Sequence, residues 1–192
     1  AYRDLEAGQA VRLPLKTTSL KGWAERQLAY AQSVELQREL DYWVAILQTP
    51  VAALPVDQGR GILTEATAQV VRTSLTLDQS QILFSEVLQP NLTTINDVLL
   101  TALALALGRW TGMRAWLIEV VGHGRSVSFD DIDLSRTVGW LVTHTPVLLQ
   151  VDSSLDAKAN LDRLKTQLRS IPAEGFGYEL LRHLSHDAAI GA

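Results

Sequence analysis

The feature that most constrains this chain is a segment at residues 95–107, INDVLLTALALAL, which would be apolar on nearly every side of a helix. Such a helix needs cover on both faces, as between a sheet and another layer. We expect it to begin at Thr93 or Thr94 and to end near Gly108. Its apolar run, residues 98–107, is about half of the roughly 20 residues that span a bilayer, so it predicts a buried helix.

Two helices are expected before this segment. Ser19 is a suitable N-cap for a helix over residues 23–30, and Ser33 for a second one. The second helix carries one apolar stripe, made by Leu36, Leu40, Trp43 and Leu47. Residues 50–65, PVAALPVDQGRGILTE, are rich in Pro, Gly and Gln, which indicates a linker.

Strands and helices alternate in the remainder of the chain. Period-two alternation over residues 71–77 predicts a half-buried strand, and further strands are expected at residues 115–121 and 146–151. Asp78 with Gln81 resembles a capping box that starts a helix ending near Pro90. A helix is expected over residues 155–170, and a turn at 172–178 leads into a final short helix. The alternation predicts an α/β fold with helices packed on an open sheet.

Composition excludes several classes of protein. The 192 residues, 47% of them hydrophobic, suit one domain or one unit plus part of another. The absence of cysteine excludes a disulfide scaffold, a thiolate metal site and a Cys nucleophile. A net charge of −4 without a basic run argues against a nucleic-acid partner. The start, AYRDLEAGQA, has neither an initiator Met nor an apolar signal segment, so we expect a cut into a longer chain.

The glycine-bearing loop Gly122-His123-Gly124-Arg125 follows an expected strand. A dinucleotide site would need a third Gly where Val127 stands, followed by a helix. A nucleophile elbow would need Ser in place of His123. From the residues alone we favour a sharp turn, with Arg125 neutralising an aspartate at position 130, 131 or 133.

Histidines and tryptophans are given structural interpretations. His183 and His186, with Asp187 adjacent, have a spacing that could bind a metal, but they lack further ligands, and we favour a solvated polar face. The tryptophans lie beside apolar residues, which is typical of a core or a tunnel wall. They are Trp23, Trp43, Trp110, Trp116 and Trp140.

Several motifs occur in a fixed order: SLKGWAERQLAYAQSVELQRELDYW, TINDVLLTALALAL, GHGRS, RTVGWLVTHTPVLLQ and IPAEGFGYELL. Together they resemble the condensation-domain superfamily of nonribosomal peptide synthetases, most of all its epimerization branch. Residues 136–150 are similar to the epimerization pattern RTVGWFTxxYPVxLE. The resemblance implies an α/β, chloramphenicol-acetyltransferase-like lobe with an open mixed sheet and packed helices. Two such lobes form a V with a tunnel for pantetheine arms.

The resemblance also implies an organisation and a set of partners. Residues 1–50 would be the tail of the first lobe with connecting helices, and residues 51–192 the second lobe, truncated at its end. The partners would be a peptidyl carrier protein bearing 4′-phosphopantetheine, the first lobe and neighbouring synthetase domains, in the cytoplasm. No directly bound cofactor, metal, nucleic acid or membrane is expected. Residues expected at the substrate channel or inter-lobe contact are Gly122, His123, Gly124, Arg125, Arg136 and Trp140.

Two departures from the family pattern concern catalysis. The active-site motif HHxxxDG is absent, and residues 183–187 match HxxxD only formally, because Arg182 and Ala188 replace its flanking His and Gly. In the epimerization motif EGHGRE, Val121 and Ser126 replace the two glutamates. Glu119 would share a strand face with Val121, about 7 Å back. We therefore assign no catalytic residue from the sequence and expect the chain alone to be inactive.

Three functions are compatible with this resemblance. The first is Cα epimerization of aminoacyl or peptidyl thioesters in the intact domain, which requires a base within reach of the Cα proton. The second is amide-bond formation, which requires less, because a positioned amine is already a nucleophile. The third is a non-catalytic domain for carrier docking or partner recruitment. In each case some apolar surface should be exposed around the loop at residues 122–140 or the segment at residues 23–47.

Overall fold

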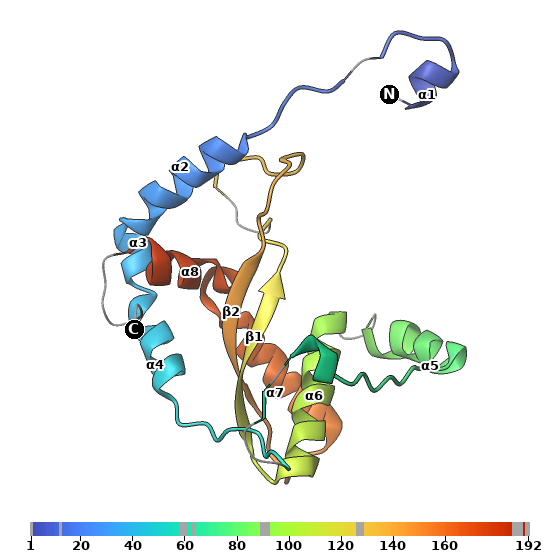
Figure 1. Ribbon diagram of the computed structural model, residues 1–192, viewed down its shortest axis with the longest axis vertical. Coiled ribbons are helices and arrows are strands. Elements are labelled where there is room, and N and C mark those ends of the chain that lie inside the picture. Colours follow the sequence, from blue (N-terminus) through green and yellow to red (C-terminus); the bar gives the residue numbers. More distant parts are fainter. Residues whose placement is uncertain are drawn as a thin grey trace. The chain divides into compact units, whose positions relative to one another are not determined.

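The computed structural model describes residues 2–11, 13–57, 61–62, 64–88, 93–125, 129–185 and 190 (Figure 1). Its α-helices are α1 (Tyr2–Glu6), α2 (Leu20–Ala31), α3 (Val34–Gln37), α4 (Leu40–Gln48), α5 (Leu77–Ile82), α6 (Ile95–Thr111), α7 (Ala157–Arg169) and α8 (Phe176–His183). Short 3-10 turns lie at η1 (Glu65–Thr67) and η3 (Pro172–Gly175), and η2 (Leu83–Leu88) is a π-helix. The strands are β1 (Ala115–Gly122) and β2 (Thr143–Gln150).

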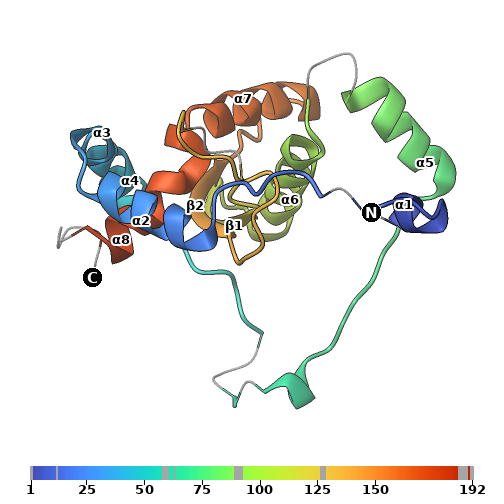
Figure 2. The same cartoon turned by 90° about the horizontal axis from the view of Figure 1, so that it is seen from above.

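The chain forms two compact units, of which the first comprises Ala1–Ala45, Glu119–Pro146 and Pro172–Ala192. In this unit α2 and α8 lie side by side (Figures 1 and 2). An aromatic cluster joins them: the ring centroids of Trp23 and Phe176 are 5.4 Å apart, and those of Tyr30 and Phe176 are 6.1 Å apart. Offset and edge-to-face rings at these separations attract one another beyond the burial of their area.

The caps of α2 and α3 confirm the prediction from the sequence. Ser19 Oγ accepts a hydrogen bond from the Gly22 amide at 3.0 Å, and Ser33 Oγ accepts one from the Leu36 amide at 3.2 Å. The expected second helix is divided into α3 and α4, but its stripe still faces inward, with Leu36 and Trp43 fully buried.

The second unit comprises Ile46–Ile118 and Val147–Ile171, and in it α6 packs on α7 (Figure 2). A buried amide secures the turn from β2 into α7. Asn160 Nδ2 donates to the carbonyls of Asp152, Leu155 and Asp156, and its Oδ1 accepts from the Asp152 amide. Because these bonds satisfy the side chain, it can be fully buried without an unpaired polar group.

The boundaries of α6 differ in part from those expected. Thr94 is the N-cap, and it forms a reciprocal capping box with Asp97. The helix runs through Gly108 and ends at Gly112, which adopts the left-handed conformation with φ 73°. Gly108 lies inside the helix, and the left-handed conformation that ends it is adopted by Gly112 instead. The expected end at Gly108 was therefore wrong.

Cover on both faces of α6 was also expected, and the described residues do not provide it. Thr101 and Ala104 are buried, but Leu99 is 55% exposed and Leu103 is 42% exposed. The apolar composition of the helix predicted burial on all sides. How much of its surface is buried depends on how many elements pack on it, and here α7 covers one side.

The strand expected over residues 71–77 was wrong. Residues 68–76 have no regular structure, and Val71 is 96% exposed. A period-two pattern becomes a strand only beside a partner and a core, and this segment pairs with neither β1 nor β2. The following helix, α5, is capped by Thr76 in a reciprocal box with Gln79, and not by the expected pair Asp78 and Gln81.

The strands β1 and β2 pair in an antiparallel register. The Val151 amide donates to the Arg114 carbonyl at 3.0 Å, and at the other end Gly122 lies against the side chain of Thr143. The same number of residues separates Arg114 from Gly122 on one strand as Thr143 from Val151 on the other. The register between these two contacts is therefore unbroken. Val121 therefore lies opposite His144. Strand β2 also begins earlier than expected, at Thr143, and takes in Pro146.

The contact between α8 and the α3–α4 turn makes a test of packing. A β-carbon at Gly177 would lie 2.8 Å from Leu36 Cδ1 and would overlap the Glu39 carboxylate, which accepts a hydrogen bond from Trp43 Nε1. We expect Gly177→Ala to lower the free energy of unfolding by about 1–3 kcal/mol through overpacking. Urea unfolding measures this change.

Gly22→Ala is the matched control, because Gly22 is also helical and a β-carbon there makes only ordinary contacts, the nearest at 3.4 Å. This variant should leave stability unchanged or raise it by up to about 1 kcal/mol. Equal effects at the two positions would contradict the packing role of Gly177.

Candidate functional site

The loop between β1 and β2, in the first unit, contains the residues singled out from the sequence. Its first turn depends on Gly124, which has φ +64° and whose α-carbon lies against the backbone carbonyl of Leu141. A side chain at this position would overlap that carbonyl, so only glycine fits. The sharp turn expected from the glycines is confirmed at Gly124.

Arg125 connects this turn to the second half of the loop. Its guanidinium donates to the Leu134 carbonyl and, at 2.9 Å, to the Thr137 carbonyl. Its backbone amide donates to His123 Nδ1 at 3.0 Å. The expectation that Arg125 neutralises a nearby aspartate was wrong, because the planar donor fork meets two carbonyls instead.

The same loop is tied to the segment before α2. The Thr18 amide donates to the Asp133 carbonyl at 3.0 Å, and Thr18 Oγ1 accepts from the Asp133 amide at 2.9 Å. Thr137 Oγ1 donates to the Thr18 carbonyl at 2.6 Å. Hydrogen bonds from Ser135 lower the pKa of the Asp133 carboxyl below its usual value. These hydrogen bonds hold the loop at residues 133–137 against Thr18, which is far from it in sequence.

The side chain of Arg26 attaches the loop to α2. The Arg26 guanidinium carbon lies 4.1 Å from the centroid of the Phe129 ring, and Arg26 Nε lies 3.3 Å from Asp131 Oδ1. Asp131 is therefore paired with an arginine of α2, and not with Arg125.

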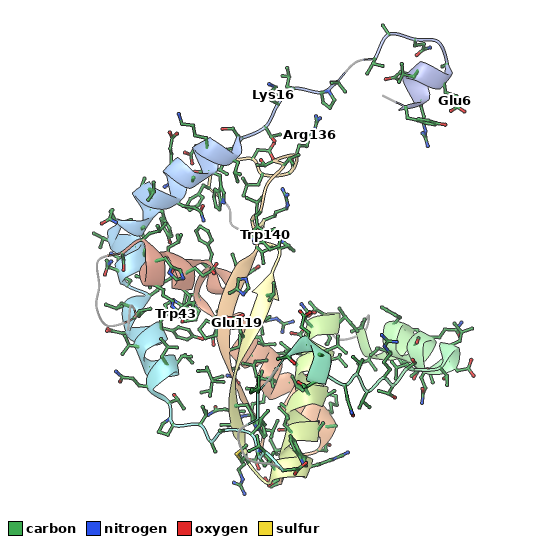
Figure 3. All side chains as sticks on the ribbon, in the orientation of Figure 1. Glu6, Lys16, Trp43, Glu119, Arg136 and Trp140 are labelled. Atoms are coloured by element: carbon green, nitrogen blue, oxygen red, sulfur yellow. The ribbon has the colours of Figure 1, made fainter. Side chains whose placement is uncertain are left out.

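Part of the loop presents apolar side chains to solvent. Val138 is 92% exposed, Trp140 is 84% exposed, and Val121 at the end of β1 is 60% exposed. Figure 3 shows Trp140 where the loop meets the strands and Arg136 farther out, with Arg136 Nη1 3.4 Å from the Leu15 carbonyl. The exposed patch expected around this loop is confirmed.

The tryptophans divide between two environments. Trp23, Trp43 and Trp116 are buried, as expected of core residues. Trp110 and Trp140 are mostly exposed, so local apolar spacing alone did not predict their burial.

The face of the sheet that carries Val121 also carries a pair of polar residues. His144 Nδ1 and Glu119 Oε1 are 2.9 Å apart, with side-chain exposures of 40% and 63%. The hydrogen bond to Glu119 raises the pKa of His144 above its ordinary value; desolvation opposes this shift, and the charges of Glu119 and Glu179 reinforce it. The sequence did not indicate this pair, because only the strand register brings the two residues together.

Glu119→Gln should lower the pKa of His144 toward that of a free histidine, because an amide cannot stabilise the imidazolium as a carboxylate does. NMR titration of the His144 ring measures this change. The stability that comes from the raised pKa is present below the unfolded-state pKa and is lost as pH rises through the folded-state pKa. The variant should therefore lose more stability in mildly acidic than in alkaline solution.

His183→Gln is the control for this titration, because His183 is exposed on α8 and removing it should leave the His144 pKa in place. An unchanged His144 pKa in Glu119→Gln would contradict the pairing.

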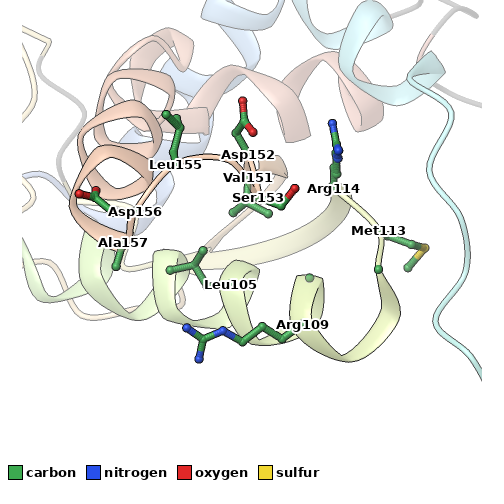
Figure 4. A pocket seen from close by; sticks show the side chains of 12 residues that line it. Leu105, Arg109, Met113, Arg114, Val151, Asp152, Ser153, Leu155, Asp156 and Ala157 are labelled. Atoms are coloured by element: carbon green, nitrogen blue, oxygen red, sulfur yellow. The ribbon is translucent and has the colours of Figure 1, made fainter.

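Other candidate sites are weaker. The described residues contain no group of three or more metal-ligating side chains, and His186, Asp187 and Ser126 lie outside the residues that the structure describes. Figure 4 shows a hollow in the second unit in which Arg109 extends along the far side of α6 from Arg114, so the two cations do not converge. No helix among the described ranges is long and apolar enough to cross a membrane.

The contribution of the two Arg125 guanidinium hydrogen bonds to stability can be tested by substitution. Arg125→Lys keeps the charge but cannot reproduce two bonds in one plane, so we expect a loss of about 1–2 kcal/mol in unfolding free energy. Denaturant unfolding followed by circular dichroism measures it. Arg136→Lys, which alters one long contact, should change stability by less than about 0.5 kcal/mol. A larger effect at Arg136 than at Arg125 would reverse this assignment.

Comparison with solved structures places this fold in a class. The chain superposes on the epimerization domain from the third module of tyrocidine synthetase B with a TM-score of 0.85 and 35% identity, over 97% of this chain and 42% of that one. It superposes on the first condensation domain of the calcium-dependent antibiotic synthetase with a TM-score of 0.70 and 22% identity, over 97% of this chain and 40% of that one. The fold is thus the α/β, chloramphenicol-acetyltransferase-like fold of these synthetase domains.

Sequence comparison then gives the family. The family model for the condensation domain matches residues 1–189, and the chain belongs to this family. It is 45% identical to one polypeptide of the linear gramicidin synthase of Brevibacillus parabrevis over 189 residues, which are 98% of this chain and 2% of that protein. It is 44% identical to another polypeptide of the same synthase, over 99% of this chain and 4% of that protein. The chain therefore spans only a small part of these relatives.

Proposed function

We propose that this chain is the second-lobe part of an epimerization-type domain that inverts the Cα of an aminoacyl or peptidyl group held as a thioester on a carrier protein. Residues 1–50 would supply the tail of the first lobe and the connecting helices, and residues 51–192 the second lobe. The observation that carries the proposal is the likeness to an epimerization domain, 35% identical with a TM-score of 0.85, against 22% and 0.70 for a condensation domain.

The geometry of the loop suits a channel wall in such a domain. The Arg125 guanidinium binds the loop backbone at Leu134 and Thr137, just before the exposed side chains of Val138 and Trp140. These exposed side chains would contact the thioester arm or the first lobe. In this proposal Gly122, His123, Gly124, Arg125, Arg136 and Trp140 line the channel or the contact between lobes. The 4′-phosphopantetheine arrives on the carrier protein and is not a resident cofactor of the chain.

The test uses the chain together with the first lobe supplied by its own synthetase and a carrier protein loaded with an aminoacyl thioester in D2O. We expect deuterium to enter at Cα and both stereoisomers to appear, because inversion breaks and remakes the Cα–H bond. Mass spectrometry and chiral analysis of the released amino acid measure this. The chain without the first lobe is the matched control and should leave the substrate unchanged.

Two other outcomes would overturn the proposal. Formation of a dipeptide from donor and acceptor carriers without Cα exchange would establish the amide-bond-forming alternative. Binding of the carrier without exchange or peptide formation would establish a docking or recruitment domain.

A further inference from the structure

A groove of about 310 Å³ in the first unit lies where the segment before α2 meets the loop between β1 and β2. Its charged lining comprises Lys16 from the segment and Arg136 from the loop, and none of the described residues that line it is a carboxylate. Figure 3 shows Lys16 and Arg136 on these two neighbouring stretches of chain. Both side chains are exposed, so the groove is open to solvent and positively charged.

The two walls of this groove are held together by contacts within the chain. Thr18 exchanges hydrogen bonds with the backbone of Asp133, and Thr137 Oγ1 donates to the Thr18 carbonyl at 2.6 Å. A β-carbon at Gly139 would lie 2.8 Å from Leu20 Cδ1, so the loop backbone also packs closely on the start of α2. The groove is therefore formed before a ligand binds, which lowers the entropic cost of binding.

A hydrogen bond orients Arg136 at the groove. Its Nη1 lies 3.4 Å from the Leu15 carbonyl oxygen, which can accept one proton from it. A guanidinium has five N–H donors, so this contact leaves donors for an anion. The charge of Arg136 also helps to lower the pKa of Asp133, but that carboxylate does not line the groove.

The groove also has an apolar lining. Leu13, Leu20 and Val138 contribute to it, and their exposed fractions are 74%, 44% and 92%. Two cations beside apolar surface suit a ligand whose anionic end adjoins an apolar group. The 4′-phosphopantetheine arm of a carrier protein has this pattern, because one methylene joins its phosphodiester to the dimethyl-substituted carbon of the pantoyl group.

We propose that this groove binds the phosphate and the pantoyl group of the 4′-phosphopantetheine arm. Lys16 and Arg136 contact the phosphate, and Leu20 and Val138 contact the methyl groups. This inference rests on the proposed function, in which the arm arrives on a carrier protein. Trp140 lies nearer to the strands than Arg136 does, so the arm extends from the groove past Trp140 toward the end of β1 (Figure 3).

The experiment compares the binding of 4′-phosphopantetheine and of pantetheine to the complete two-lobed domain by isothermal titration calorimetry. The phosphorylated compound should bind about 5- to 30-fold more tightly at low salt, as expected for two exposed cations. Added salt should reduce this advantage by screening the charges. The double variant Lys16→Gln with Arg136→Gln should remove the advantage and leave the affinity for pantetheine within about twofold, because only the phosphate contact is lost.

Three further variants separate charge from packing. Lys21→Gln is the matched control, because Lys21 is an exposed lysine of α2 that pairs with Glu25 and does not line the groove, and it should keep the full advantage. Arg136→Lys retains the charge and should keep most of the advantage. Val138→Ser should weaken both compounds alike, by about two- to fivefold, through the loss of apolar contact. The substituted side chains are exposed, so the variants should fold, and thermal melting checks this.

The outcomes separate this inference from the proposed function. Equal affinity for the two compounds, no binding of either, or an advantage that survives in the double variant would overturn the site. Inorganic phosphate that binds as tightly as 4′-phosphopantetheine would overturn the contact with the pantoyl group. None of these measurements involves Cα exchange. Loss of exchange with the phosphate advantage intact would therefore overturn epimerization alone, and exchange without a phosphate advantage would overturn the groove alone.

Discussion

The antiparallel pairing of β1 with β2 is the constraint on which the candidate site depends. Its register places Val121 opposite His144 and brings Glu119 within hydrogen-bonding distance of that histidine. A slip of one residue would send these side chains to opposite faces of the sheet. The backbone of Gly124 against Leu141 continues the pairing into the loop, where a side chain could not be accommodated.

Packing in the first unit supports this register from one side. Gly175, in the left-handed conformation, lies against Thr145 of β2, and the aromatic rings of Trp23 and Phe176 join α2 to α8. Because the buried side of β2 is occupied in this way, the polar pair of β1 and β2 is left on the accessible side. The loop beyond the strands is ordered by hydrogen bonds instead, since Arg125 binds two of its carbonyls. Its apolar side chains Val138 and Trp140 therefore stay exposed.

Local patterns in the sequence determined the helices and their caps well. Ser19, Ser33 and Thr94 each accept a hydrogen bond from the first turn of the helix that they start, because a capping hydroxyl acts within its own turn. The motif order also indicated the family that the comparisons establish. Patterns that depend on a distant partner were less informative. The alternating segment at residues 71–77 pairs with neither described strand, and no described element buries Leu99 of α6.

The details of the site were decided by tertiary structure. The aspartates near Arg125 in sequence predicted an ion pair, but the fold brings its guanidinium to the carbonyls of Leu134 and Thr137. The residues Glu119 and His144 are visible in the sequence, yet no spacing rule connects them, because their contact follows from the register of two strands joined by a long loop. The sequence by itself determined the family, the N-caps Ser19, Ser33 and Thr94, and the turn after β1, since these are local or ordered along the chain. Only the tertiary structure decided which carboxylate meets which histidine.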